Sequence, residues 1–338
     1  MSGKEKLWGR FDDFYDYIVK ITYEIWESRG VEKIRDYYGR DMKLHTPDGM
    51  IVGAEKVVLN TYEMLNQFPD RRLLPEDVVW DTRPGKEHGR DGTVHYSSHR
   101  LLSTMNHQGK GAFGNPTGKQ VVIRTVADCA VQDGVIFEEW LVRDRVGLMM
   151  SLGLDVEEQI GKMAAAAIAD GSAAALTKRA AGVKEGVCCE TEGKPLALAY
   201  ANTLKDIWHG ELGKFSAGYH EACRIETSLN RTLYGHESAH RNYFRYLSCF
   251  SDCVFSVDNL VELHEPGMPA RVSVRWSLSA RHEGFGPFGE PTGGQIYILG
   301  INQAFIAGGK VFEEWAMIDE AALMKQVRIH QFNQQDKK

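Results

Sequence analysis

Several common binding motifs are missing from the sequence. There is no G-x-x-x-x-G-K-[ST], no G-x-G-x-x-G after an expected strand and no G-x-S-x-G, the patterns that bind phosphates and dinucleotides or present a nucleophilic serine. None of the six cysteines forms a C-x-x-C pair, so a cysteine-based zinc or redox site is not expected. We therefore expect any chemistry to depend on side chains alone, without a cofactor or a metal.

The sequence also lacks long apolar runs and a strong charge of either sign. No stretch approaches the roughly eighteen apolar residues that cross a membrane, and the first residues, "MSGKEKLWGR", contain no apolar leader. A net charge of −6 gives no reason to expect nucleic acid or an anionic membrane as a partner. With 338 residues, 43% of them hydrophobic and 25% charged, the chain is expected to form two globular domains in the cytoplasm.

What the sequence does contain is an internal repeat. "VIFEEWLVRD" at 135–144 returns as "KVFEEWAMID" at 310–319. Residues 111–144 align with 286–319 at a constant offset of 175, and 14 of 34 positions are identical. The chain is therefore a tandem duplication. The first repeat carries extra residues around 81–95, a glycine-rich and charged stretch that predicts an extended hairpin tip.

Each repeat begins with helical patterns and ends with strand patterns. Residues 11–30 and 195–215 space apolar side chains three and four apart, whereas 271–284 and 294–319 alternate with a period of two. Helices followed by an antiparallel sheet predict an α+β fold, because the two layers must bury their apolar faces on each other. We expect a first domain at 1–152, an alanine-rich helical linker at 153–194 and a second domain at 195–338.

The order of motifs within each repeat resembles the SnoaL-like polyketide cyclases. A helix with "IW" is followed by "LHTPDG", a strand ending in histidine, "PTG", and "FEEW" with an aspartate four residues after the tryptophan. These cyclases belong to the nuclear-transport-factor-2-like superfamily, so the resemblance implies two tandem cone-shaped α+β barrels. It also implies a cofactor-independent enzyme that uses acid–base chemistry for cyclisation, isomerisation or dehydration of a small apolar carbonyl compound.

Asp144 and Asp319 are the first candidate catalytic residues. Each follows its strand tryptophan by four residues and so lies on the same face of a strand. If that face lines a pocket, burial raises the carboxyl pKa and makes the group a general acid or base near neutral pH. The spacing alone leaves open a strand-end aspartate that caps a turn or pairs with Arg143 or Arg145. The resemblance favours the catalytic role, because the cyclases use an aspartate on this final strand.

Three histidines are further catalytic candidates, with the task of orienting the substrate or stabilising negative charge on its oxygen. His107 and His282 align across the repeats, each at the end of the strand before "PTG". His45 matches the family's strand histidine in "LHTPDG", but the second repeat has Glu226 at this position. The two pockets are therefore expected to differ, with the first repeat as the active copy.

Aromatic residues are expected to form the apolar wall of each pocket. Trp140 and Trp315 belong to the two "FEEW" motifs, and Trp276 has Leu101 as its equivalent in the first repeat. At most one glutamate of each motif can face a pocket, because neighbouring residues of a strand point to opposite faces. The expected substrate-binding residues are Trp140, Trp315, Trp276, Glu226, Phe113 and Phe288, with packing as the simpler role of the two phenylalanines.

Two other functions stay open at this point. A non-catalytic protein would hold a hydrophobic ligand, or act as a scaffold, with the same two pockets. "HESAH" at 236–240 fits H-E-x-x-H, a zinc pattern, but the first repeat has Ala54 and Val58 at the histidine positions. The expected partner is a small apolar carbonyl-containing ligand. The two copies are predicted to form an internal pseudo-dimer that can assemble into a homo-oligomer.

Overall fold

The computed structural model describes residues 9–335, and the chain divides into two compact units. The first unit comprises Met1–Thr46, Met50–Arg143 and Leu148–Gly153; the second comprises Pro47–Gly49, Asp144–Gly147 and Leu154–Lys338. The expected linker therefore groups with the second unit. Residues 1–8, on which the expected lack of a leader rests, lie outside the described residues.

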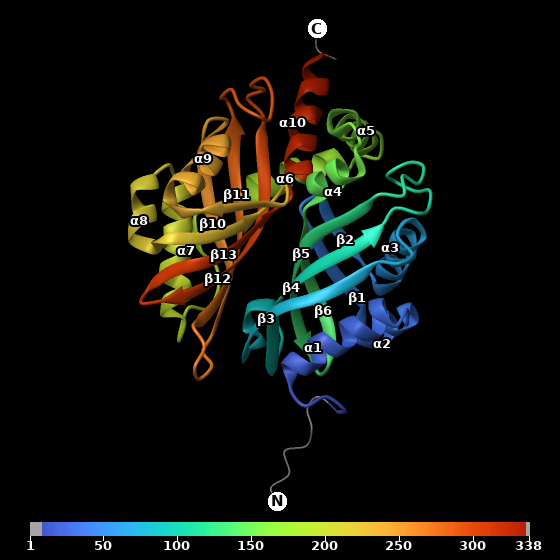
Figure 1. Cartoon of the computed structure of the whole chain (residues 1–338), viewed down its shortest axis with the longest axis vertical. Helices are drawn as coiled ribbons and strands as arrows, with labels where there is room; N and C mark the ends of the chain where they lie inside the picture. The colour runs from blue at the N-terminus through green and yellow to red at the C-terminus, as the bar shows by residue number, and fades with distance from the viewer. Residues whose placement is uncertain (1–8, 336–338) are drawn as a thin grey trace, which may run out of the picture. The chain divides into compact units, whose positions relative to one another are not determined.

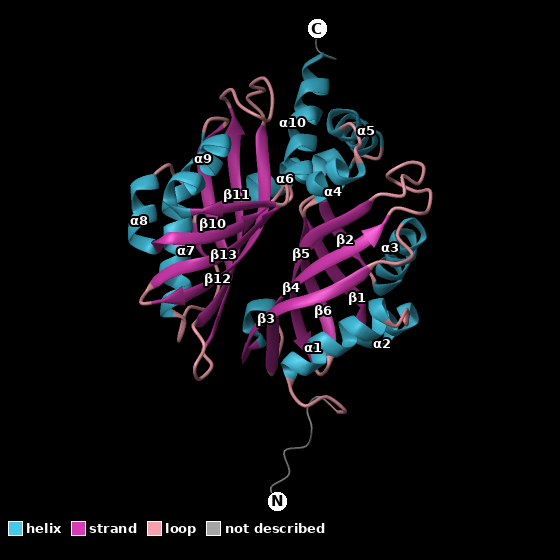
Figure 2. Ribbon diagram, viewed as in Figure 1, coloured by secondary structure: helices cyan, strands magenta, loops and turns pink. Residues whose placement is uncertain are grey.

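The first unit packs helices on one face of a curved six-stranded sheet (Figures 1 and 2). The strand order is β2-β1-β6-β5-β4-β3, with β1 parallel to β6 and antiparallel pairing from β6 through β3. The helices are α1 Phe14–Thr22, α2 Ile34–Tyr37 and α3 Ala54–Gln67. The strands are β1 Tyr38–Thr46, β2 Gly49–Val52, β3 Arg72–Pro84, β4 Thr93–Asn106, β5 Gln120–Gln132 and β6 Val135–Arg143.

Local sequence signals set the ends of these helices. Asp13 caps α1, since its carboxylate accepts a 2.8 Å hydrogen bond from the backbone N–H of Asp16. Helix α1 then continues into a π-helical turn, Tyr23–Glu27. Gly53 precedes α3 with a φ of 101°, a conformation that glycine adopts without strain. The expected helix at 11–30 is thus confirmed in its position, with a π-helical second half.

The predicted hairpin tip is confirmed as well. Strands β3 and β4 pair from Arg72 opposite Thr104 to Pro84 opposite Thr93. A short 3-10 turn, Gly85–His88, closes the hairpin at its far end. The extra residues of the first repeat therefore lengthen two paired strands and leave the order of the sheet unchanged.

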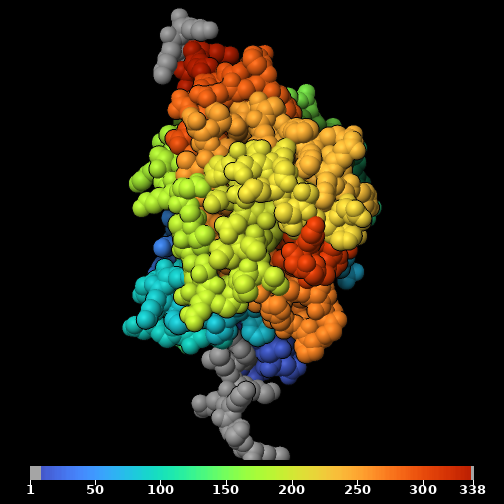
Figure 3. Space-filling model, turned by 90° about the vertical axis from the view of Figure 1, so that its left-hand side faces the viewer, coloured from blue at the N-terminus to red at the C-terminus, as the bar shows by residue number. Residues whose placement is uncertain are grey.

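The second unit repeats this plan with a seven-stranded sheet in the order β7-β10-β11-β12-β13-β8-β9. Its helices α7 to α9 cover one face and form the surface that Figure 3 shows in yellow and orange. The helices are α7 Pro195–Trp208, α8 Phe215–Gly218, α9 Gly235–Leu247 and α10 Glu320–Gln335. The strands are β8 Tyr219–Thr227, β9 Arg231–Tyr234, β10 Phe250–Leu263, β11 Ala270–His282, β12 Gln295–Ala307 and β13 Lys310–Ile318.

The segment between the two sheets is mainly helical, as its alanine content predicts. Helix α4, Arg145–Leu152, follows β6, and α5, Val156–Ala169, and α6, Ser172–Gly182, follow α4. Small alanines of α5 pack on Ile329 of α10. The short strand β7, Gly186–Val187, pairs with β10 and extends the second sheet.

The α+β fold with two tandem copies is therefore confirmed. Each unit has its own cluster of buried apolar side chains between helices and sheet. Within residues 9–335, no helix is long and apolar enough to cross a membrane.

Candidate active site

The first unit contains a cavity of about 130 Å³ between its helices and the covered face of its sheet. Helix α1, the π-helical turn with Trp26, and α3 form one side, and strands of the sheet form the other. The lining is mostly apolar, which is typical of small-molecule sites. Its polar side chains include Tyr38, Arg71, His99, Thr125, Glu139 and Arg143.

The alternation of strand residues brings most of these polar groups to one face of the sheet. On β6, Glu139 and Arg143 line the cavity, whereas Glu138 does not. The register places Thr125 of β5 directly beside Arg143. Of the two glutamates in "FEEW", the one that faces the cavity is therefore Glu139.

Glu139 has the properties of a general acid or base. Its side chain is buried, and the hydroxyl of Tyr38 donates a hydrogen bond to it. Burial raises the pKa of Glu139 to about 7, while the charge of Arg143 and the hydrogen bond from Tyr38 act in the opposite direction. A carboxyl group with this pKa takes up and releases a proton near neutral pH.

His99 and Thr125 supply neutral polar atoms to the same wall. Burial lowers the pKa of His99 to about 3, so its imidazole is neutral at physiological pH. In the described part of the chain, neither Nε2 of His99 nor Oγ1 of Thr125 has a hydrogen-bond partner, although both atoms are buried. Buried polar atoms are nearly always paired, so these two are suited to a ligand's polar group.

Two arginines add positive charge to the cavity. Arg71 precedes β3 and is 6% exposed, and Arg143 ends β6. Burial, together with the charges of Arg143 and Arg29, lowers the pKa of Arg71 to about 9, so it stays cationic at neutral pH. Among residues 9–335, Nε of Arg71 has no hydrogen-bond partner.

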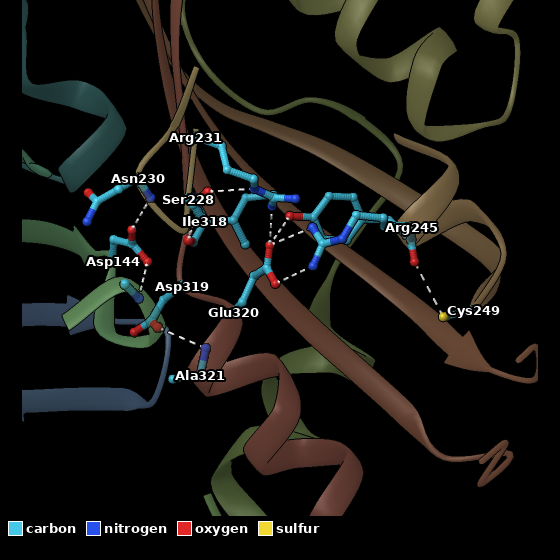
Figure 4. A network of polar contacts seen from close by, with 12 residues as sticks. Asp144, Ser228, Asn230, Arg231, Arg245, Cys249, Ile318, Asp319, Glu320 and Ala321 are labelled. Carbon is cyan, nitrogen blue, oxygen red and sulfur yellow. Dashed lines mark hydrogen bonds and ion pairs between the residues drawn. The ribbon is translucent and has the colours of Figure 1, made fainter. Parts of the chain in front are cut away.

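The structure places Asp144 outside the residues that line this cavity, at the start of α4. One carboxylate oxygen accepts a 2.9 Å hydrogen bond from the backbone N–H of Gly147, and the other a 3.1 Å bond from Asn230 (Figure 4). Burial raises the pKa of Asp144 to about 6 against these two hydrogen bonds. This geometry is that of a helix cap, the alternative that the sequence left open.

Asp319 has the equivalent position before α10. Its carboxylate accepts a 3.1 Å hydrogen bond from the backbone N–H of Ala321 and forms an ion pair with Nε of Arg145 (Figure 4 shows the first contact). The next residue, Glu320, lies between Arg231 and Arg245 and accepts hydrogen bonds from both. Both strand-end aspartates are therefore fully engaged by backbone or side-chain donors.

His107 and His282 hold their "PTG" loops to the strand ends. Nδ1 of His107 accepts a 3.3 Å hydrogen bond from the backbone N–H of Thr117, and its ring packs 5.1 Å from that of Phe68. Nδ1 of His282 lies 3.3 Å from the hydroxyl of Thr292. Both side chains are buried and neither lines the cavity. Burial lowers the pKa of both histidines, which keeps them neutral.

His45 and Trp140 also lie outside the cavity. Their rings stack at 5.1 Å, and Nε2 of His45 is 2.7 Å from Glu138. His88 contacts the other oxygen of the same carboxylate at 2.8 Å. Although burial opposes it, these two imidazoles hold the pKa of Glu138 well below its usual value. The group occupies the strand face opposite Glu139.

The remaining substrate-binding candidates contact neighbouring side chains. Glu226 accepts a 3.0 Å hydrogen bond from the hydroxyl of Thr232, and the ring of Trp315 meets Phe305 edge-on at 5.0 Å. Phe288 packs between Tyr246 and Phe250, and Phe113 packs on Phe68 in the first unit. None of the four belongs to the cavity lining.

In the second unit, aromatic side chains occupy the volume that corresponds to the cavity. Trp276, the equivalent of Leu101, is 1% exposed, and its ring lies 5.3 Å from Trp208 and 5.2 Å from Phe255. Gly300, the equivalent of Thr125, makes room for it, since a Cβ there would lie 2.2 Å from the indole. Trp276 is thus a core residue.

The polar groups of the cavity are also replaced in the second unit. Val274, Ile318 and Cys253 stand where the first repeat has His99, Arg143 and Arg71. The glutamate is kept as Glu314, but its carboxylate accepts hydrogen bonds from Tyr200, Tyr219 and Asn302. A carboxylate with three internal donors has no need of a ligand.

The "HESAH" histidines lie on α9 and contact other groups. Nε2 of His236 is 3.0 Å from the carbonyl oxygen of His220, and the ring of His240 meets Phe215 edge-on at 5.3 Å. In the range 9–335, no group of three or more histidine, cysteine or acidic side chains has the arrangement of a metal site.

Sequence reasoning missed His99, Arg71, Arg143 and Tyr38 as cavity residues. The sequence contained one indication of two of them. His99 and Arg143 are polar in the first repeat, whereas the equivalent residues of the second repeat are apolar. The alternation of "FEEW" narrowed the choice to one glutamate of the two, but it could not tell which strand face the helices cover.

Comparisons with known proteins agree with the fold. Residues 198–327 match the model of the SnoaL-like polyketide cyclase family. The second repeat is a SnoaL-like domain. No curated protein matches the chain. The cavity, with Glu139 and His99, lies in the first repeat. The match to the family model does not extend to that repeat.

Three solved structures are each similar to part of this chain. IdmH from Streptomyces antibioticus is 22% identical to this chain. The match covers 41% of this chain and 97% of the IdmH chain, with a TM-score of 0.34. AclR from Streptomyces galilaeus is 22% identical, and the match covers 40% of this chain and 92% of the AclR chain, with a TM-score of 0.33. TsrD from Streptomyces laurentii is 18% identical, and the match covers 40% of this chain and 97% of the TsrD chain, with a TM-score of 0.34.

Proposed function

We propose that the first unit is a cofactor-independent enzyme that moves a proton at the carbon next to a carbonyl group. The observation that carries this proposal is Glu139, a buried carboxyl group with a pKa of about 7 in the wall of a mostly apolar cavity. The ligand is a small carbonyl compound, since about 130 Å³ accommodates roughly one ring. The SnoaL-like second repeat supports the same class of reaction.

In this mechanism the carboxylate of Glu139 takes the proton from the carbon, and the electron pair of the C–H bond moves onto the carbonyl oxygen. Polar atoms of His99 and Thr125 and the charge of Arg143 stabilise the resulting enolate. Return of the proton to another carbon gives isomerisation. Attack of the carbanion on a second carbonyl closes a ring, and loss of hydroxide gives dehydration.

Proton exchange in a model ketone tests the proposal directly. Phenylacetone in D2O should exchange its benzylic protons faster with the protein present, as followed by proton NMR. Glu139→Gln should lower this rate by about 100-fold or more, because the amide cannot accept the proton. Glu314→Gln changes the equivalent residue of the second unit, which is enclosed by donors, and should leave the rate unchanged.

Equal rates for the wild-type protein and Glu139→Gln would contradict the proposed role. A second function, non-catalytic binding of a hydrophobic ligand, is favoured if phenylacetone binds but exchanges no faster than in buffer. The mostly apolar lining of the cavity gives that alternative its specific support.

A further inference from the structure

The lining of the cavity contains more basic than acidic side chains. Arg71 and Arg143 are both in its wall, and each contributes a positive charge at neutral pH. Glu139 is the acidic side chain of the lining, and its high pKa leaves it only partly ionised. His99 and Tyr38 are neutral, because burial lowers the pKa of the first and raises that of the second. The lining therefore contains two cationic side chains and one partly ionised carboxyl group.

The charge of Glu27 favours the cationic form of Arg71, but the carboxylate oxygens of Glu27 bond to other groups. One oxygen of Glu27 lies 3.1 Å from Nε of Arg72, and the other accepts a hydrogen bond from the backbone N–H of Leu73. In the described part of the chain, Nε of Arg71 has no partner although the side chain is 6% exposed. A buried cation without a bonded anion is costly, and binding a ligand anion would remove that cost.

The second unit provides an internal comparison. It retains the glutamate as Glu314 but has Cys253 and Ile318 in place of Arg71 and Arg143. Its equivalent volume is filled by Trp276. The two guanidinium groups thus line the cavity of the first unit and have no counterpart at the equivalent positions of the second.

We propose that the ligand of this cavity carries a carboxylate, which binds the guanidinium of Arg71 while the ligand's carbonyl group lies beside Glu139. The substrate class is then a small carbonyl-containing carboxylic acid. A planar carboxylate matches the donor fork of arginine, and the charge fixes which end of the ligand meets Glu139. This inference rests on the proposed function in one respect, that both use the same cavity.

Two probes of equal size separate charge from shape. Phenylacetate and phenylacetone have the same number of non-hydrogen atoms, but only the first is an anion at neutral pH. Isothermal titration calorimetry on the full chain should show phenylacetate binding at least about tenfold more tightly. Arg71→Gln should remove this preference, and Arg71→Lys should keep part of it. Arg241→Gln, at an exposed position of α9 in the second unit, should keep it all.

Thermal unfolding shows whether Arg71 is a binding residue or a structural one. Arg71→Gln should raise the melting temperature of the unliganded protein or leave it unchanged, because it removes an unneutralised buried charge. A structural role predicts a lower melting temperature. Such a decrease, a preference for phenylacetate that survives Arg71→Gln, or failure of phenylacetate to bind the wild-type protein would each overturn the inference.

Failure of this inference and failure of the proposed function give different results. If phenylacetone exchanges in a Glu139-dependent way but phenylacetate does not bind more tightly, the proton-transfer role stands and the anionic ligand is rejected. If phenylacetate binds through Arg71 but no exchange is accelerated, the anionic ligand stands and the proton-transfer role is rejected.

Discussion

Glu139 and Glu314 occupy the same position in their repeats but have different surroundings. Three hydrogen-bond donors enclose Glu314, whereas Glu139 faces a cavity with Tyr38 as its donor. The two glutamates pair with equivalent positions of the neighbouring strand in their sheets. Their different hydrogen bonds therefore come from the side chains that surround them on adjacent strands and helices. At the residue scale, the environment decides which carboxyl group can exchange a proton.

Glu139 should make the stability of the protein depend on pH. Its pKa is about 7 in the folded state against an ordinary 4.5, so the unfolded chain loses this proton first as the pH rises. The folded state is therefore disfavoured progressively between about pH 4.5 and 7, by about 3 kcal/mol in total. Urea unfolding at pH 4 and pH 8 should show the wild-type protein losing about that much relative to Glu139→Gln. A pH-independent difference between the two proteins would contradict the raised pKa.

Asp144 offers a test between a cap and a catalytic residue. Asp144→Ala should lower the free energy of unfolding by about 1–2 kcal/mol, because it leaves the N–H groups of Gly147 and Asn230 without their acceptor. Asp144→Asn keeps an accepting oxygen and should cost less. Its rate of phenylacetone exchange should equal that of the wild-type protein. Loss of exchange in Asp144→Asn would instead support the catalytic role expected from the family resemblance.

At the scale of elements, the strand pairs β4–β5 and β11–β12 differ in one pair of residues that face each other across the strands. Leu101 lies opposite Thr125 in the first pair, and Trp276 lies opposite Gly300 in the second. The large and small residues are matched across the strands, so the indole takes the space beside the glycine. Nε1 of Trp276 also donates a 2.8 Å hydrogen bond to Asn302, which in turn bonds Glu314.

Gly300→Ala should be strongly destabilising because its Cβ would lie 2.2 Å from the ring of Trp276. We expect a loss of about 3 kcal/mol in the free energy of unfolding, measured by urea denaturation. The same change in a Trp276→Leu background should cost much less, since the clashing ring is gone. Gly213→Ala is the control, because nothing lies within 4 Å of its added Cβ. Equal costs in both backgrounds would show that the contact with the indole is not the cause.

At the scale of the whole molecule, the duplication has given two units of one fold with different interiors. The first combines a cavity with titratable and cationic groups, and the second has an aromatic core with an internally bonded glutamate. We infer that ligand binding belongs to the first unit and that the second contributes folded structure. That the copies form an internal pseudo-dimer, or assemble further, stays a prediction.

The full chain should therefore bind one molecule of phenylacetate. Calorimetric titration gives the stoichiometry, and Glu314→Gln should leave it at one per chain. The double variant Leu101→Trp with Thr125→Gly copies the second unit into the first, fills the cavity and should abolish binding without loss of the fold by circular dichroism. Two molecules per chain, or binding retained by the double variant, would contradict this assignment.

The sequence by itself determined the duplication, the order of helices and strands, and the α+β class. These features are local or periodic: "FEEW" recurs at a fixed offset, and the alternation of apolar residues distinguishes strands from helices. Alternation also required Glu138 and Glu139 to point to opposite faces. The prediction of a helical segment rich in alanine followed from intrinsic propensity.

Only the tertiary structure decided which face of each sheet the helices cover and whether the space beneath them is open. Both faces of β6 carry polar and aromatic residues, so the pattern along the strand does not distinguish Glu139 from His45 and Trp140 as cavity groups. Arg71 and His99 come together with Glu139 through contacts between distant segments. Trp276 fills the space beside Gly300 on the neighbouring strand, a match that no single segment reveals.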